Sequence, residues 1–166
     1  MTTRDGSAAT RPIREFRSDG AYRDRVAVGQ GANNEWRGEC PSEHTFEGQG
    51  TDMELHLVHK SAAGVNAVVG VKVVRGPSSG ALGQIFAQLP DDLDVHHPLA
   101  APFNPRHFLP ADRDYYRYEG SLTTPPCTEG VHWLVLKDPI TVSSEDLAQY
   151  HERIHFNARP VQRFSR

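Results

Sequence analysis

The sequence has few cysteines and no long apolar run, and these two shortages limit what the chain can be. Only Cys40 and Cys127 occur among 166 residues, so at most one disulfide can form, provided that their Cβ atoms meet. Buried free cysteines are common, and Cys40 is expected to be one. No apolar segment approaches the roughly 20 residues that cross a bilayer, and the amino terminus lacks the apolar core of a secretory signal. As written, the chain is expected to start in the cytoplasm, whereas a start further upstream would allow a periplasmic or secreted protein.

An excess of charge of one sign is also missing. The 18 basic and 21 acidic residues are intermixed and leave a formal net charge of −3. No basic stripe is present for a nucleic acid or an anionic membrane, so neither partner is expected. The length and the 37% apolar content favour one domain with a modest core.

The apolar pattern predicts strands beyond an unpatterned beginning. Residues 1–35 carry scattered arginines among Gly, Ser, Asp and Asn with almost no periodic apolar residues, which predicts a loose segment. Residues 53–59 alternate, and 66–74 form a valine-rich run after an Ala-Ala-Gly turn, so these runs are expected to be neighbouring antiparallel strands. Residues 131–136 also have the composition of a strand.

Helical signals are fewer. Residues 84–89 predict a short amphipathic helix before a proline, and 91–114, rich in Pro, Asp and His, predicts mostly loop. A second helix is expected to begin after a cap at Ser143 or Ser144 and to run to about His155. Several strands with few helices indicate an α+β, mainly β fold, and no internal repeat is visible.

Glu54 and His56 are the first candidates for chemistry. Two positions apart on a strand, they project from the same face, whereas Leu55 and Leu57 point to the other. A carboxylate beside an imidazole is often the contact that orients a metal-bound histidine. The alternative is an ordinary hydrogen-bonded histidine of the core or surface.

The segment Ser-Leu-Thr-Thr-Pro-Pro-Cys at 121–127 is more specific. Its hydroxyls are followed by two prolines, which restrict φ and remove two backbone donors, so the loop is expected to be rigid. A rigid loop that carries hydroxyls can orient a nucleophile or a substrate. A purely structural turn explains the same pattern.

Four segments together carry a resemblance to a known family. Pro-Ser-Glu-His at 41–44, the alternating run 53–59, the segment 116–127 and Asn-Ala-Arg-Pro-Val-Gln at 157–162 stand in the order found in α-carbonic anhydrases. The chain resembles that family over about residues 36–162. The resemblance implies a partial domain over 36–166 with an antiparallel-rich sheet, and zinc-dependent, reversible hydration of carbon dioxide to bicarbonate as the family activity.

The resemblance also implies roles for individual residues. His56 matches the third zinc ligand and Glu54 the carboxylate that orients it. Thr123 matches the threonine that accepts a hydrogen bond from zinc-bound hydroxide, and Glu43 the acid that accepts from this threonine. Zinc held by three neutral histidines lowers the pKa of its bound water to about 7, which supplies hydroxide to attack carbon dioxide.

An apolar wall for carbon dioxide is implied as well. Val58, Val68, Leu122 and Trp133 match its residues, and Thr124 matches a position near the pocket mouth. Each of the four apolar residues is equally well explained by core packing.

The resemblance fails at two ligand positions. Where the family places a His-x-His pair before Pro-Ser-Glu-His, this chain has Arg37 and Glu39. Arginine carries a permanent positive charge that repels a divalent cation. A carboxylate can ligate zinc, so Glu39 and His56 could form a weak two-ligand metal site. Arg37 is instead expected to pair with Glu39 or Glu54 at the former metal position.

The other histidines do not replace the missing pair, and His96-His97 falls in a predicted loop. The amino-terminal part of the family, including the region of its proton-shuttle histidine, is not matched either. Uncovered sheet edges would favour self-association. Cys127 resembles a cysteine whose usual partner lies in the unmatched region, so it is left free or pairs with Cys40.

Three interpretations remain open from the sequence. The chain is an impaired carbon dioxide hydratase, a non-catalytic binding module that retains the carbonic anhydrase fold, or a gene fragment without a function of its own. Carbon dioxide and bicarbonate are the partners that the first interpretation implies.

Overall fold

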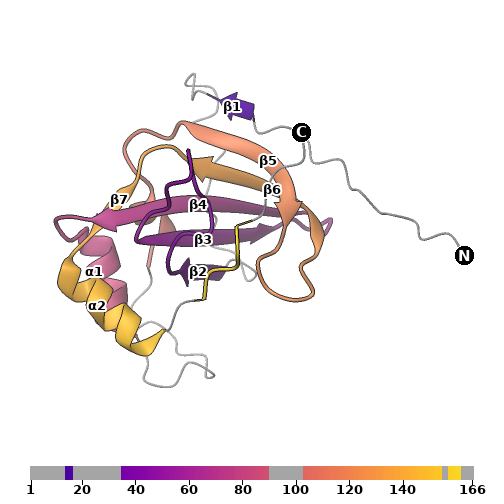
Figure 1. Ribbon diagram of the computed structural model, residues 1–166. Helices are drawn as coiled ribbons and strands as arrows, with labels where there is room; N and C mark the ends of the chain where they lie inside the picture. Colours follow the sequence, from indigo (N-terminus) through magenta and orange to yellow (C-terminus); the bar gives the residue numbers. More distant parts are fainter. Residues whose placement is uncertain (1–13, 17–34, 90–102, 155–156, 162–166) are drawn as a thin grey trace, which may run out of the picture.

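The computed structural model of the chain describes residues 14–16, 35–89, 103–154 and 157–161 (Figure 1). Seven strands form one mixed sheet in the order β1-β5-β6-β4-β3-β2, with β7 paired to β4. The strands are β1 Arg14–Phe16, β2 Glu35–Glu39, β3 Met53–Lys60, β4 Asn66–Arg75, β5 Tyr115–Ser121, β6 Glu129–Leu136 and β7 Ile140–Val142. The expectation of an α+β, mainly β fold is confirmed.

The strands β3 and β4 form the antiparallel pair that the apolar pattern predicts. Their register places His56 opposite Gly70 and Val58 opposite Val68. The turn between them is closed by a hydrogen bond from Ser61 N to Val65 O (2.9 Å), and Gly64 has a φ of 80°, which glycine adopts without steric cost. On its other side β4 runs parallel to β6, which makes the sheet mixed.

The helices differ in part from the prediction. Helix α1 covers Gly80–Phe86, so the predicted helix at 84–89 was placed four residues too late. The reason is the cap: Ser79 Oγ accepts a hydrogen bond from Leu82 N (3.4 Å), and the helix therefore begins directly after Ser79. Helix α2 covers Ser144–Arg153 with Ser143 as its cap, close to the prediction.

Local structure also occurs where loop was expected. A short 3₁₀ helix, η1, covers Pro105–Phe108 inside the stretch predicted as connection. The apolar pattern predicted three of the strands. It did not predict β1, β2, β5 and β7. Strand β1 lies within the segment expected to be loose and pairs with β5. In the part of the chain that is described, no helix has the length and apolar character to span a membrane.

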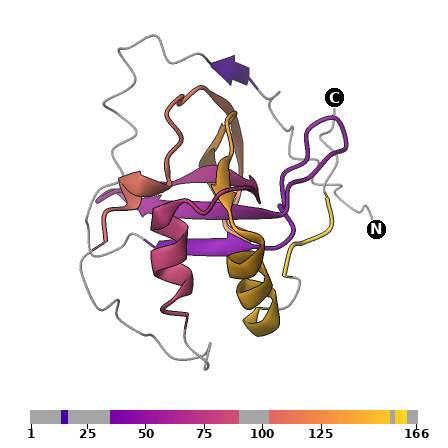
Figure 2. The ribbon, with the colours of Figure 1, turned by 90° about the vertical axis from the view of Figure 1, so that its left-hand side faces the viewer.

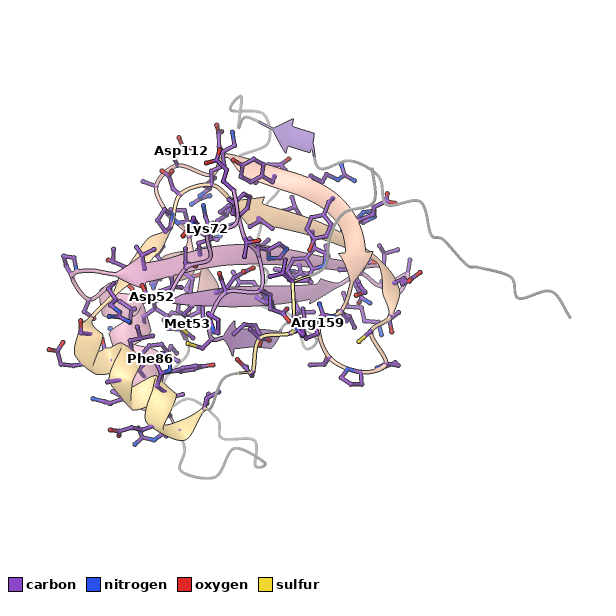
Figure 3. The ribbon with its side chains drawn as sticks, viewed as in Figure 1. Asp52, Met53, Lys72, Phe86, Asp112 and Arg159 are labelled. Atoms are coloured by element: carbon purple, nitrogen blue, oxygen red, sulfur yellow. The ribbon has the colours of Figure 1, made fainter. Side chains whose placement is uncertain are left out.

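One face of the sheet is covered by the two helices. Figure 2 shows α1 and α2 side by side across the strands. The main apolar core lies here, and Met53 and Phe86, labelled in Figure 3, both belong to it. Leu55 and Leu57 point into this core, as the alternation of β3 predicts. The opposite face holds a smaller cluster of Val68, Val131, Trp133 and Val135.

Candidate active site and metal centre

The strand β3 places Glu54 and His56 together on the face away from the helices. Both side chains are buried, and His56 Nε2 lies 3.0 Å from Glu54 Oε1. An ionised carboxylate can only accept, so His56 donates from Nε2. The carboxylate–imidazole contact expected from their spacing is therefore formed, and the lone pair of His56 is left on Nδ1.

Glu54 also binds His44, to which the sequence analysis gave no role. His44 N donates to Glu54 Oε2 (3.0 Å), and His44 Nδ1 lies 2.5 Å from Oε1. The other ring nitrogen, Nε2, is 2.6 Å from the hydroxyl of Tyr118. Burial raises the pKa of Tyr118 well above its ordinary value, so Tyr118 keeps its proton and donates it to His44. Both ring nitrogens of His44 are thus engaged.

The charge of Glu54 is set by these contacts. Burial, the largest single influence, raises the pKa of this carboxyl, but the hydrogen bonds and the electrostatic attraction of His44 and His56 together outweigh burial and hold the pKa well below its usual range. Space for the carboxylate comes from Gly70 on β4, where a Cβ atom would stand 2.9 Å from Glu54 Oε1. The result is a fixed, ionised carboxylate behind His56.

The strand β2 supplies the next wall of the site. Its register places Arg37 beside His56 and Glu39 beside Glu54. Glu39 is buried, and its Oε1 lies 3.9 Å from His56 Nδ1, the nitrogen that is free for a ligand. The side chain of Arg37 lies outside the described residues, as do His96 and His97. The expected ion pair of Arg37 with Glu39 or Glu54 therefore stays a prediction.

Glu43 approaches from the loop after β2. Its Oε1 accepts hydrogen bonds from Arg159 N (3.1 Å) and Arg159 Nε (2.9 Å), and Arg159 is labelled in Figure 3. Oε2 of Glu43 is buried and has no hydrogen-bond partner within the described ranges. The bond from Thr123 that the resemblance implies is thus absent, although Oε2 is the atom that could accept it. Thr123 itself is half-buried in the loop after β5.

The loop that carries Thr123 and Thr124 is held by several contacts. Leu122 N donates to Thr128 O (2.9 Å), and Cys127 N donates to Thr124 O (2.9 Å). The indole of Trp133 donates to Ser121 O (3.0 Å). These bonds agree with the rigid loop that the prolines predict.

The residues of the expected apolar wall come together. Val58 and Leu122 pack against the cluster that contains Val68 and Trp133, and the ring of Trp133 lies 4.8 Å from that of His56. The cluster therefore borders the imidazole. This arrangement serves a substrate wall and ordinary packing equally well, so the roles of these residues stay predictions.

Both cysteines are free. Cys40 is fully buried, and its thiol donates to Asp52 O (3.1 Å). His151 Nε2 lies 3.2 Å from the same sulfur. The alternative of a Cys40–Cys127 bridge is not realised, because the thiol of Cys40 is engaged between β3 and α2.

Two groups of side chains bring enough ligand atoms together for a metal ion. In each group, one ligand atom per residue lies within 4.8 Å of the others: His44, Glu54 and His56 in the first, and Glu39, Glu43 and His56 in the second. The first group is already joined by hydrogen bonds. The second offers one imidazole nitrogen and two carboxylate oxygens. It fits a divalent cation, but with other donors than three histidines.

The fold and the site define a class: a mainly β protein in which a buried histidine on a central strand is backed by a carboxylate and faces ligand positions on the next strand. The model of the eukaryotic-type carbonic anhydrase family matches residues 31–165. The chain belongs to this family of α-carbonic anhydrases.

Individual relatives agree with this assignment. A carbonic anhydrase of Klebsiella pneumoniae is 44% identical over 124 residues, which cover 74% of this chain and 50% of that protein. The α-carbonic anhydrase of Thermovibrio ammonificans, solved with the inhibitor sulfanilamide, has a TM-score of 0.75 at 40% identity, over 78% of this chain and 57% of its own. Dioscorin, solved with ascorbate, has a TM-score of 0.70 at 31% identity, over 78% of this chain and 56% of its own. The chain spans about half the length of the curated relatives it matches.

The sequence analysis missed three residues of the site. His44, Tyr118 and Arg159 all stand inside the segments that carried the resemblance. Their positions within these segments were the available signal. Their contacts join residues 10 to 116 positions apart, so local pattern does not show them.

Proposed function

We propose that this chain carries a modified carbonic anhydrase pocket, which accepts carbon dioxide or bicarbonate but hydrates carbon dioxide weakly or not at all. The observation that carries this proposal is the position of Glu39. Its carboxylate faces Nδ1 of His56 at 3.9 Å, at a position where the resemblance places a second imidazole. A catalytic zinc site of the carbonic anhydrase type uses three histidines and an open fourth position.

The residues of this chain would still contribute to hydration. His56 would hold zinc through Nδ1, and Glu39 would add an oxygen ligand. When bound by three histidines, zinc supplies hydroxide at neutral pH. Glu54 keeps the imidazole oriented, and Thr123, on its rigid loop, would orient the nucleophile if it donated to Oε2 of Glu43.

The replacements weaken this chemistry for two reasons. Arg37 stands in register with His56, and arginine has no lone pair to offer, so one of the three imidazole donors that zinc uses in this family is lost. A carboxylate ligand also donates negative charge to zinc, which makes the bound water less acidic than three neutral imidazoles do. Both effects reduce the fraction of chains that carry zinc-bound hydroxide at neutral pH.

A second candidate function is a non-catalytic binding module. Arginine at a ligand position favours it, because a guanidinium suits an anion better than a cation. Dioscorin, which shares the fold and was solved with ascorbate, is a structural neighbour. Under this alternative, the pocket binds a small molecule without metal.

The test is to restore histidine at both positions. The variant Arg37→His/Glu39→His should retain close to one zinc per chain after dialysis, because it again offers three imidazoles. Carbon dioxide hydration, followed by stopped-flow with a pH indicator, should rise by at least about tenfold over the unmodified chain. Zinc content is measured by elemental analysis on samples that circular dichroism shows to be folded.

The matched control adds His56→Ala to the double variant and should lose both the zinc and the gain in hydration. A folded double variant with unchanged zinc content would contradict the alignment of positions 37 and 39 with the ligands. An unmodified chain that holds full zinc and hydrates as fast as the double variant would contradict the proposed impairment.

A further inference from the structure

The carboxylate of Glu43, which lies close to His56, has one unexplained atom. The Glu43 side chain is only 7% exposed, and its Oε2 has no hydrogen-bond partner in the described part of the chain. A buried carboxylate oxygen without a partner loses its hydration without compensation. A ligand at this atom would supply the missing interaction.

The free nitrogen of His56 faces the same place. Since Nε2 donates to Glu54, Nδ1 carries the lone pair that a metal ion can use. Glu39 Oε1 lies 3.9 Å away on β2. One ligand atom each of Glu39, Glu43 and His56 lies within 4.8 Å of the others, and all three side chains are at least nine-tenths buried.

We propose that Glu39, Glu43 and His56 form a divalent-cation site with one nitrogen and two oxygen donors, which takes Mn²⁺. The site rests on the pocket of the proposed function, since it uses the same donors of His56 and Glu39, but it gives Oε2 of Glu43 to the ion and not to Thr123. Its third donor, Glu43, comes from the Pro-Ser-Glu-His loop and is not one of the three ligand positions at which the resemblance places histidine. Glu39 in place of a histidine therefore changes which metal ion the site prefers as well as how tightly it binds the ion.

The donor set argues for this class of ion. Carboxylate oxygens suit Mn²⁺, whereas a set of three imidazoles suits zinc. Two carboxylate donors also give the site a negative charge that suits a divalent cation. Arg159 balances part of this charge, through Oε1 of Glu43, and leaves Oε2 for the ion.

The neighbouring group of His44, Glu54 and His56 is not the site. His44 uses Nδ1 on Glu54 and Nε2 on Tyr118, and His56 uses Nε2 on Glu54. An ion there would have to break these bonds. The group instead holds His56 in the orientation that turns Nδ1 toward Glu39.

The experiment measures binding of Mn²⁺ alone to the complete 166-residue chain, by electron paramagnetic resonance of free Mn²⁺ and by isothermal titration calorimetry. The unmodified chain should bind about one Mn²⁺, and its melting temperature should rise with Mn²⁺ because the ion binds the folded state. Glu43→Gln and Glu39→Gln should each weaken binding by roughly tenfold or more, since each removes one charged ligand. The control Glu129→Gln removes an exposed carboxylate and should leave the affinity unchanged.

The outcomes separate the alternatives. Loss of affinity in both pocket variants, with none in the control, supports the three-donor site. Weakening in Glu39→Gln but not in Glu43→Gln would overturn the role of Glu43. Absence of Mn²⁺ binding, or equal binding by all variants, would overturn the site. Because hydration is not measured, failure here is distinct from failure of the histidine restoration.

Discussion

At the scale of the residue, Cys40 shows how burial controls reactivity. Burial and then the nearby charge of Asp52 raise the pKa of its thiol to about 11, so it stays protonated at neutral pH. The thiolate is the nucleophilic form of cysteine. Cys127, in contrast, is partly exposed on the loop after Pro126.

Iodoacetamide at mildly alkaline pH should therefore modify Cys127 and leave Cys40 unmodified in the folded chain. Peptide mass spectrometry after digestion measures the extent at each site. In urea both cysteines should react, because unfolding removes the burial that protects Cys40. Equal modification of the two thiols in the folded chain would show that Cys40 is accessible.

At the scale of the element, β4 is adapted to the site on β3. Gly70 lies opposite His56, and a Cβ atom at Gly70 would meet Glu54 Oε1 at 2.9 Å and Val135 at 3.5 Å. The oxygen cannot move away easily, because His44 and His56 hold it. A side chain at this position of β4 thus competes with the carboxylate for space.

Gly70→Ala should lower the free energy of unfolding by about 1–3 kcal/mol, as overpacking of a buried place does. Urea denaturation followed by circular dichroism measures the change. Gly80→Ala is the matched control, since nothing lies within 4 Å of its Cβ position at the start of α1. If both variants have the same stability, Glu54 is not confined as described.

At the scale of the whole molecule, the buried charge of Glu54 couples stability to pH. Its pKa in the folded chain lies below its ordinary value of 4.5, because the hydrogen bonds from the two histidines outweigh burial. A lowered folded-state pKa contributes stability that is present above the unfolded-state pKa and lost as the pH falls toward the folded-state value. Acid should therefore weaken the entire fold through this residue.

We expect the free energy of unfolding to fall as the pH is lowered from about 5 to about 2, and to fall less in Glu54→Gln. The same variant should be less stable than the unmodified chain at pH 7. The neutral amide of glutamine cannot accept hydrogen bonds from both histidines as the carboxylate of Glu54 does. Urea titrations at each pH measure both effects. Glu129→Gln should retain the slope of the unmodified chain, and an unchanged slope in Glu54→Gln would exclude Glu54 as the source.

Sequence alone determined the features that depend on neighbours along the chain. Alternation on 53–59 separated Glu54 and His56 from Leu55 and Leu57, since successive strand residues point to opposite faces. Serine before an acidic turn placed α2. The ordered segments identified the family, and they predict that Arg37 and Glu39 stand in place of two zinc ligands. The cap at Ser79 was equally local but went unused, so α1 was misplaced.

Tertiary structure decided which side chains meet in the pocket. Glu43 and Arg159 are 116 positions apart, and His44 and Tyr118 are 74 positions apart. These pairs depend on the sheet order β5-β6-β4-β3-β2, in which β5 carries Tyr118, and on the path of the carboxyl-terminal segment that carries Arg159. The unpartnered Oε2 of Glu43 has the same origin, because Arg159 engages only Oε1. Periodicity carries no information about such contacts, which arise only when distant strands and loops pack together.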